Sequence, residues 1–237
     1  TELESISGIG KVKAKKLVDE HNIKSIDDLI SRVNNNSIKL SHHIEMGVKY
    51  HKDIIKRIPR KDIEDYDNIL KENIKIIDKN LILTICGSYR RGLESSGDID
   101  ILISHPKYLT EISKQKFLQK FVKLLIDSNI IVDSLTNQGN KKYMGMCKLP
   151  NKKTVNRIDI RCVDYNAYFT ALLYFTGSKQ FNIYIRKKAL ENGYKLNEYS
   201  LINKKTQENI YLQSEEELFN LVNIDYIEPT DRNNIIY

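Results

Sequence analysis

The sequence lacks tryptophan altogether and has only four prolines and three cysteines among its 237 residues. The cysteines are scattered, without the spacing of a metal site, and each lies in an apolar, strand-like run: Cys86, Cys147 and Cys162. We therefore expect buried free thiols in a reducing compartment rather than disulfides or zinc ligands. No apolar run approaches the ~20 residues that a membrane helix needs, and no signal-peptide pattern opens the chain. These absences favour a globular protein that has no membrane partner.

Positive charge exceeds negative charge along the chain. Lysine and arginine total 38 against 31 aspartates and glutamates, which gives a net charge of +7 and a pI near 9.1. This balance suits a polyanionic partner such as nucleic acid, but charge alone does not separate a nucleic-acid-binding protein from an ordinary basic one.

The order of predicted elements indicates an α+β protein in three parts. Residues 1–56 have a helical pattern around a glycine-containing turn, and "RIPR" ends it because Pro59 disfavours helix at the residue before it. A mixed unit follows, with helices at about 61–78 and 113–128 and strands at 81–86, 98–104 and 156–163. From residue 166 we expect a smaller helical lobe with one hairpin. The predicted divisions are 1–58, 59–165 and 166–237.

Three carboxylates lie on two of the predicted strands. Asp98 and Asp100 leave the same face of one strand, while the isoleucines between and after them leave the other face. In "RIDIR" the alternation repeats, so Asp159 shares a face with Arg157 and Arg161. If these strands are neighbours, three carboxylates meet at one edge and repel one another unless a cation lies between them. Oxygen ligands of this kind suit Mg²⁺.

A Gly-Ser turn precedes the first of these strands. Gly87 and Ser88 follow an apolar strand and open "YRRG", a predicted helix start whose backbone amides, with the Ser88 hydroxyl, form an anion site. Arg90 and Arg91 add charge-assisted donors, although only one of the two need face the phosphates. A lone Asp-x-Asp usually marks solvated acidic residues. The Gly-Ser turn, the Asp-x-Asp ten residues later and a third aspartate on a later strand together favour a nucleotidyltransferase site, in which cations bridge carboxylates and a triphosphate.

Longer motifs resemble the family X DNA polymerases, with DNA polymerase beta as the closest match. The resemblance runs in order through "ISGIGKVKAKKLVDE", "GSYRRGLESSGDID", "RIDIR", "YFTGSKQFN", "NEYSLI" and "YIEPTDR". It covers essentially the whole chain. It implies a catalytic palm of mixed sheet and helices (59–165), flanked by a thumb-like helix-hairpin-helix DNA-binding lobe (1–58) and a small nucleotide-selection lobe (166–237).

The resemblance implies a role for each matching residue. Two Mg²⁺ ions, or Mn²⁺ in their place, would be held by Asp98, Asp100 and Asp159, with Arg157 also in the catalytic set. Nucleotide contacts are implied for Arg57, Ser88, Arg91, Gly97, Tyr174, Phe175, Gly177, Lys179 and Asn182. DNA contacts are implied for Gly8, Gly10, Lys11, Arg157 and Arg186. Backbone carbonyls of Glu4, Ile6 and Ile9 match those that hold Na⁺ or K⁺ in the family's hairpin.

The chain also departs from the family pattern. Nothing in it corresponds to the N-terminal lyase domain of polymerase beta, so we expect no lyase activity from these residues. Lys179 stands where the family pattern has an acidic residue near the incoming base. His42 and His43 are far in sequence from the aspartates, and we expect them at a helix start in the N-terminal lobe rather than in catalysis.

The function predicted from these motifs is template-directed, gap-filling DNA synthesis of repair type, by a monomer acting on gapped or nicked double-stranded DNA and dNTPs. One alternative is a template-independent terminal transferase, but the segment "TNQGNKK" (136–142) is short where such relatives carry a long loop. A non-catalytic DNA-binding module would not need three aspartates and a phosphate turn. An RNA-adding nucleotidyltransferase would explain neither the hairpin nor "YFTGS".

Overall fold

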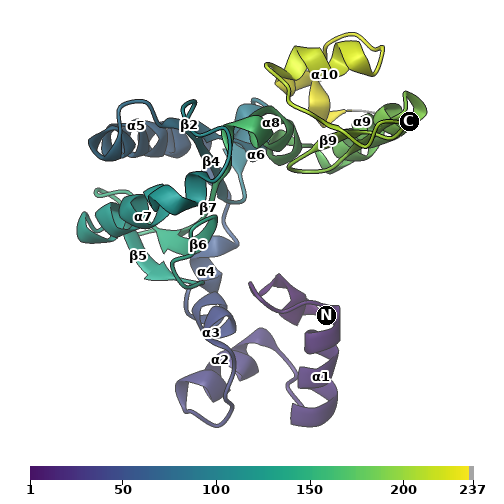
Figure 1. The fold of residues 1–237 in the computed structure, drawn as a ribbon. Helices are drawn as coiled ribbons and strands as arrows, with labels where there is room; N and C mark the ends of the chain where they lie inside the picture. Colours follow the sequence, from purple (N-terminus) through teal and green to yellow (C-terminus); the bar gives the residue numbers. More distant parts are fainter. Residues whose placement is uncertain (235–237) are drawn as a thin grey trace.

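Three lobes follow one another along the chain in the computed structural model, which describes residues 1–234. They form an open C in which the central lobe joins an N-terminal helical lobe to a C-terminal lobe (Figure 1). Within the described residues, no helix is both long and apolar enough to cross a membrane.

The N-terminal lobe is a small bundle of short helices. Its elements are η1 (Glu2–Ser5), α1 (Lys11–His21), α2 (Ile26–Asn34), α3 (His42–Lys49) and α4 (His51–Ile54). Ser25 begins α2 as expected for an N-cap, since its side chain accepts a hydrogen bond from the Asp28 amide. Nine buried apolar side chains, among them Leu17, Leu29 and Ile44, give this lobe a core of its own.

The central lobe is a mixed five-stranded sheet, which confirms the predicted α+β class. The strand order is β2-β4-β7-β6-β5, and only β4 and β7 run parallel. The bounds are β2 (Ile82–Ile85), β4 (Ile99–Ser104), β5 (Ile131–Ser134), β6 (Lys142–Cys147) and β7 (Asn156–Cys162), with a short ribbon of β1 (Ile58–Pro59) and β3 (Ser95–Ser96). The sequence pattern did not single out β5 and β6 as strands.

Helices bury one face of this sheet. The isoleucines of β4 and β7 pack under α5 (Arg60–Ile77) and α7 (Phe117–Asp127), the latter preceded by η2 (Ile112–Gln115). The other face carries the aspartates, and Leu102, two residues beyond Asp100, is covered there by α8 (Tyr168–Thr176). The strand alternation therefore puts the aspartates on the face opposite α5 and α7.

The C-terminal lobe continues from η3 (Tyr165–Ala167) and α8 into α9 (Lys179–Glu191) and α10 (Glu215–Leu221), and ends in η4 (Pro229–Asn233). The prediction of one hairpin here was wrong. The structure has a three-stranded antiparallel sheet of β8 (Tyr194–Leu196), β9 (Leu201–Asn203) and β10 (Asn209–Ile210). A two-residue strand is too short to give a period-two pattern, so β10 left no signal.

Candidate active site

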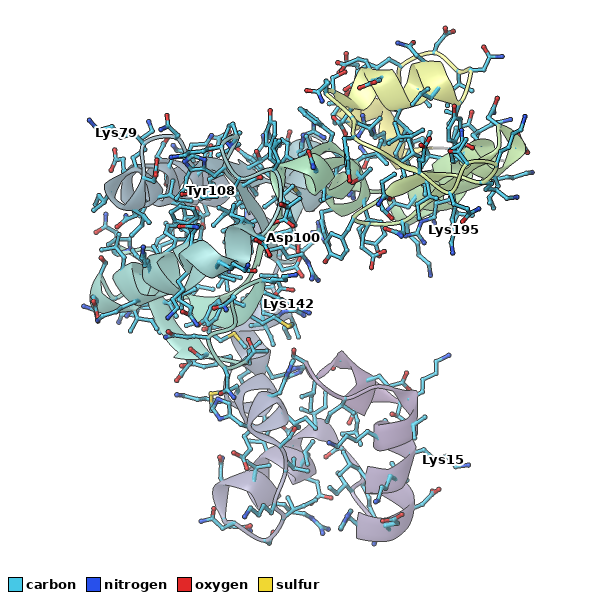
Figure 2. The ribbon with its side chains drawn as sticks, viewed as in Figure 1. Lys15, Lys79, Asp100, Tyr108, Lys142 and Lys195 are labelled. Carbon is cyan, nitrogen blue, oxygen red and sulfur yellow. The ribbon has the colours of Figure 1, made fainter. Side chains whose placement is uncertain are left out.

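The sheet register brings the three aspartates together. Asp100 on β4 lies directly opposite Asp159 on the parallel strand β7, and Asp98 immediately precedes β4. Each offers a carboxylate oxygen, and these oxygens all lie within 4.8 Å of one another. Figure 2 shows Asp100 on the side of the central lobe that faces the inside of the C.

One arginine lies between two of these carboxylates. Arg157 Nη2 is 3.3 Å from Asp98 Oδ2 and 3.5 Å from Asp159 Oδ2. A single guanidinium cannot balance three carboxylates. Asp159 Oδ1 is also buried without a hydrogen-bond partner among the described residues. An orphaned buried oxygen next to uncompensated negative charge fits a cation ligand.

The electrostatics of the cluster lead to the same conclusion. Burial, followed by the negative charges of Asp98 and Asp159, raises the pKa of Asp100 to about 7. Burial also raises the pKa of Asp159, although the positive charge of Arg157 opposes this. A divalent cation would remove the repulsion, and an all-oxygen donor set suits Mg²⁺ or Mn²⁺.

This repulsion should make the metal-free protein less stable as pH rises. A carboxyl whose folded-state pKa exceeds its unfolded value costs stability as it ionises, here between about pH 4 and about pH 7. We expect Asp100→Asn to raise the melting temperature in EDTA by about 3–6 °C near pH 8, for about 1–2 kcal/mol, and to have little effect near pH 5. Thermal melts across this range check the expectation.

Magnesium supplies the control for that measurement. It should raise the melting temperature of the wild type near pH 8 and shift the Asp100→Asn variant far less, because the variant lacks one of the ligands. Equal melting temperatures of the two proteins in EDTA at both pH values, or equal magnesium shifts, would contradict a repulsive metal-ligand cluster.

The Gly-Ser turn lies directly against the cluster. Gly87 has a φ of +57°, and a Cβ built on it would be 2.8 Å from Asp100 Oδ2, so only glycine fits between turn and carboxylate. The turn opens α6 (Gly87–Arg90), and Ser88 Oγ donates to Ser96 Oγ at 2.7 Å. The backbone of the predicted phosphate turn therefore lies next to the predicted metal ligands.

Two further predicted phosphate contacts lie on the β1–β3 side of the turn. Arg57 is exposed, and its Nε donates to Ser95 Oγ at 2.8 Å, which fixes the guanidinium beside β3. Gly97 is exposed, and nothing lies within 4 Å of where its Cβ would be. The surface above Gly97 is thus open for close approach of a ligand.

The segment "YFTGS" ends α8 and leads into α9. Gly177 has a φ of +66°, and its peptide bond to Ser178 is cis. Asn182 Nδ2 donates to the Tyr174 carbonyl at 2.8 Å, which leaves a second N–H on that amide, while its Oδ1 is buried without a partner among the described residues. Arg186 stacks over the Tyr174 ring at 5.1 Å.

Phe175 and Lys179, the remaining predicted nucleotide contacts of this segment, lie around the same turn. The guanidinium of Arg161 stacks over the Phe175 ring at 4.5 Å. Lys179 is exposed at the start of α9. Lys179, Asn182 and Arg186 all lie on α9, so the predicted nucleotide and template contacts lie on this helix and on the turn before it.

The glycine hairpin of the N-terminal lobe faces the same part of the central lobe. A cavity of about 390 Å³ is lined by the hairpin from Glu4 to Gly10, by the end of α4, and by Gly97 and Arg157. Gly8 has a φ of +91°. Lys11 begins α1, exposed, directly after the hairpin. The hairpin carbonyls of Glu4, Ile6 and Ile9 lie close in sequence around this turn, and Ile6 O accepts from the Ile9 amide at 3.0 Å.

Sequence reasoning missed one neighbour of the aspartates. His42 and His43 do begin α3, but the fold brings His43 close enough to the sheet edge that burial, then the charge of Arg157, lowers its pKa. Its Nε2 is 3.2 Å from Ser7 Oγ of the hairpin. No local pattern carries this contact, because the two partners are 36 residues apart.

Comparison with known families places the whole chain. The model for the fingers domain of DNA polymerase lambda matches residues 1–55, that for the DNA polymerase beta palm matches 57–165, and that for the DNA polymerase beta thumb matches 171–233. These three domains, in this order, are those of the DNA polymerases of the beta and lambda type. The chain therefore belongs to family X of the DNA polymerases. In the terms of these models, the first lobe, called thumb-like above, is the fingers domain and the last lobe is the thumb.

Individual relatives agree with the family match. The chain is 28% identical to DNA polymerase lambda of Arabidopsis thaliana over 95% of its own length and 45% of that protein. It is 30% identical to DNA polymerase lambda of Rattus norvegicus over 79% of its length and 35% of that protein. It is 26% identical to DNA nucleotidylexotransferase of Gallus gallus over 98% of its length and 50% of that protein. The chain thus spans half or less of the length of these relatives.

Proposed function

We propose that this chain is a template-directed DNA polymerase of repair type, which fills short gaps by adding dNMP from dNTP to a primer 3′-hydroxyl with release of pyrophosphate. The observation that carries the proposal is the three-carboxylate cluster packed against the Gly-Ser turn. Relatives named DNA polymerase lambda support the same activity.

The residues divide the chemistry between them. Asp98, Asp100 and Asp159 would hold two Mg²⁺ ions, which would lower the pKa of the attacking hydroxyl and offset the charge of the phosphates. Asp159 lies on the neighbouring strand with a free oxygen, and there it orients the primer 3′-hydroxyl for in-line attack. Arg157 bridges the carboxylates of Asp98 and Asp159 and contacts the primer terminus.

The triphosphate and the base are held by separate groups. Arg57, Ser88, Arg91 and Gly97 surround the phosphates, where donors fixed before binding stabilise the charge that develops on transfer. The backbone of Tyr174, Phe175 and Gly177 lies against the sugar. Asn182 offers its second N–H to the minor-groove edge of the base, Arg186 contacts the template, and Lys179 adds a positive charge beside the nucleotide.

The N-terminal lobe holds the DNA without reading its sequence. The backbone amides near Gly8 and Gly10, with Lys11, contact a phosphate of gapped or nicked duplex. The carbonyls of Glu4, Ile6 and Ile9 would hold Na⁺ or K⁺. A net charge of +7 supports this sequence-independent attraction. The chain acts as a monomer.

Replacing the two hairpin glycines separately tests this part of the proposal. A Cβ on Gly8 would lie 2.9 Å from the His43 ring at a strained φ of +91°, whereas a Cβ on Gly10 meets nothing within 4 Å. We expect both variants to weaken binding of gapped DNA, Gly8→Ala about five- to tenfold, for about 1–1.5 kcal/mol, and Gly10→Ala less, because its methyl group meets no protein atom and strains no backbone. Fluorescence anisotropy at fixed salt measures both, and equal losses would contradict the hairpin geometry.

The proposed activity is tested on a one-nucleotide gapped duplex. Each dNTP is offered opposite each template base with Mg²⁺, and insertion of only the complementary nucleotide is the expected result. Insertion regardless of the template base would instead support a terminal transferase, the activity that the name of the Gallus gallus relative indicates. Binding of the duplex without any insertion would leave a DNA-binding module and overturn the proposal.

A further inference from the structure

Two adjacent arginines beside the Gly-Ser turn have opposite surroundings. Arg90 is ion-paired, since its Nη2 and Nη1 are 2.6 Å and 3.2 Å from the two oxygens of Glu215, a carboxylate that it shares with the buried Arg232. Arg91 is half-buried, yet no carboxylate of residues 1–234 lies within ion-pair distance of it. A buried cation without a counterion is costly unless an anion is bound there. Of the two arginines, Arg91 is therefore the one that can bind an anionic ligand.

The guanidinium of Arg91 is nonetheless held in one orientation. Its Nη1 donates to the carbonyl of Thr176 at 2.6 Å, and its Nε donates to Asn233 Oδ1 at 2.7 Å. The guanidinium is planar, so two fixed nitrogens also fix the direction of the third. Nη2 remains accessible and has no hydrogen-bond partner among the described residues.

Asn233 holds the backbone of the turn as well as the side chain. Its Nδ2 donates to the carbonyl of Arg91 at 3.1 Å and to that of Thr230 at 3.0 Å. The same segment packs closely on the next residue, because a Cβ on Gly92, whose φ is +79°, would lie 2.9 Å from Thr230 Cγ2. The η4 segment is therefore fitted onto the phosphate turn across 142 residues of sequence.

We propose that Asn233 is a positioning residue that holds Arg91 for the triphosphate of the incoming nucleotide. The inference rests on the proposed function and adds a residue from the C-terminal segment to its nucleotide site. Because Asn233 and Thr176 fix the guanidinium before binding, Arg91 loses little side-chain freedom when Nη2 meets a phosphate oxygen. Docking of η4 onto the turn and binding of the phosphates are thereby coupled.

The test compares Asn233→Ala with Asn234→Ala, a variant of the same residue type that is exposed and next in the chain. With Mg²⁺ present, we expect Asn233→Ala to weaken the binding of inorganic tripolyphosphate about tenfold. Competition by dTTP shows that the tripolyphosphate occupies the nucleotide site. The KM for dNTP should rise by a similar factor. We expect kcat to change less than about twofold and the melting temperature to stay within about 2 °C of the control. Unchanged tripolyphosphate affinity would overturn the inference.

The same change made in the Arg91→Lys variant shows whether Asn233 acts by positioning Arg91 or by a general effect on the structure. Lysine has no planar fork for Asn233 to hold, so in Arg91→Lys the further change Asn233→Ala should weaken tripolyphosphate binding less than about twofold. A full additional tenfold loss in that background would show that Asn233 does not act through Arg91. Tripolyphosphate binding needs no turnover, so it can be measured even if the chain inserts no nucleotide. A failure of the proposed function can therefore be told apart from a failure of this inference.

Discussion

Asp159→Asn is expected to lower the rate of nucleotide insertion on a gapped duplex by at least about 10³-fold, while the affinity for that duplex changes little. The change removes one carboxylate charge from a cluster whose oxygens lie within 4.8 Å of one another, and it replaces an oxygen of the proposed metal site by an amide. Several kcal/mol of charge stabilisation at the reacting phosphate corresponds to a loss of this size, since each ~1.4 kcal/mol is tenfold in rate.

Replacing the Asp159 carboxylate by an amide should change the stability of the fold little. Asp159 Oδ1 has no hydrogen-bond partner among the described residues, and its Oδ2 meets Arg157 only at 3.5 Å. Burial raises the pKa of the Asp159 carboxyl, so a neutral side chain of the same shape relieves an unfavourable charge. Loss of activity with an unchanged or higher melting temperature is therefore the expected combination.

Asp127→Asn is the matched control for this experiment. Asp127 is an exposed aspartate at the end of α7, the helix that covers the opposite face of the same sheet. Its removal should leave single-turnover insertion within about twofold of the wild type. If Asp159→Asn retained more than about a tenth of the activity, the three-carboxylate cluster would not be the catalytic centre.

Much of the central lobe could be predicted from short-range sequence patterns. The alternation in "DIDILI" and "RIDIR" fixes which side chains enter the core, and the structure buries Ile99, Ile101, Ile158 and Ile160. The same alternation puts the aspartates on the other face. That they meet also depends on β4 and β7 being neighbours, which the register of Asp100 opposite Asp159 shows.

The contacts that complete the site could not be predicted in this way. Asn233 reaches Arg91 across 142 residues, and His43 reaches Ser7 across 36. The first contact depends on how the C-terminal lobe packs on the central lobe, and the second on how the hairpin and α3 pack within the N-terminal lobe. An asparagine near a chain end also has no period that reveals its partner. The sequence pattern indicated Arg91 as a phosphate ligand but contained no signal for the two groups that orient it.

The largest stability effect is expected from Glu215, the carboxylate between the central and C-terminal lobes. It is 4% exposed and accepts hydrogen bonds from Arg90 on the central lobe and from Arg232, which is fully buried, at 2.8 Å. Glu215→Ala leaves both guanidinium groups without their counterion in a buried site. Breaking a buried ion pair from one side costs about 3–5 kcal/mol, which lowers the melting temperature by about 8–15 °C in a chain of this size.

The stabilisation by Glu215 should depend on pH in a definite direction. Burial alone would raise the pKa of Glu215, but the hydrogen bonds and charges of Arg90 and Arg232 outweigh it and hold that pKa below its usual value. A carboxyl with a lowered folded-state pKa stabilises the fold above its unfolded pKa, and this contribution is lost as pH falls through the folded pKa. The stability difference between wild type and Glu215→Ala should therefore be constant from about pH 8 to about pH 5.5 and shrink below about pH 4.5.

Glu216→Ala is the control for Glu215→Ala, because Glu216 is the next residue in the first turn of α10 and is exposed. Its removal should cost less than about 0.5 kcal/mol at any of these pH values. Urea unfolding of both variants from about pH 8 to about pH 4 measures the differences. A Glu215→Ala protein as stable as Glu216→Ala, or one whose deficit grows as pH falls, would show that the two arginines do not depend on this carboxylate. The expected result would make Glu215 the counterion of Arg90, whereas Arg91 has no carboxylate of residues 1–234 within ion-pair distance.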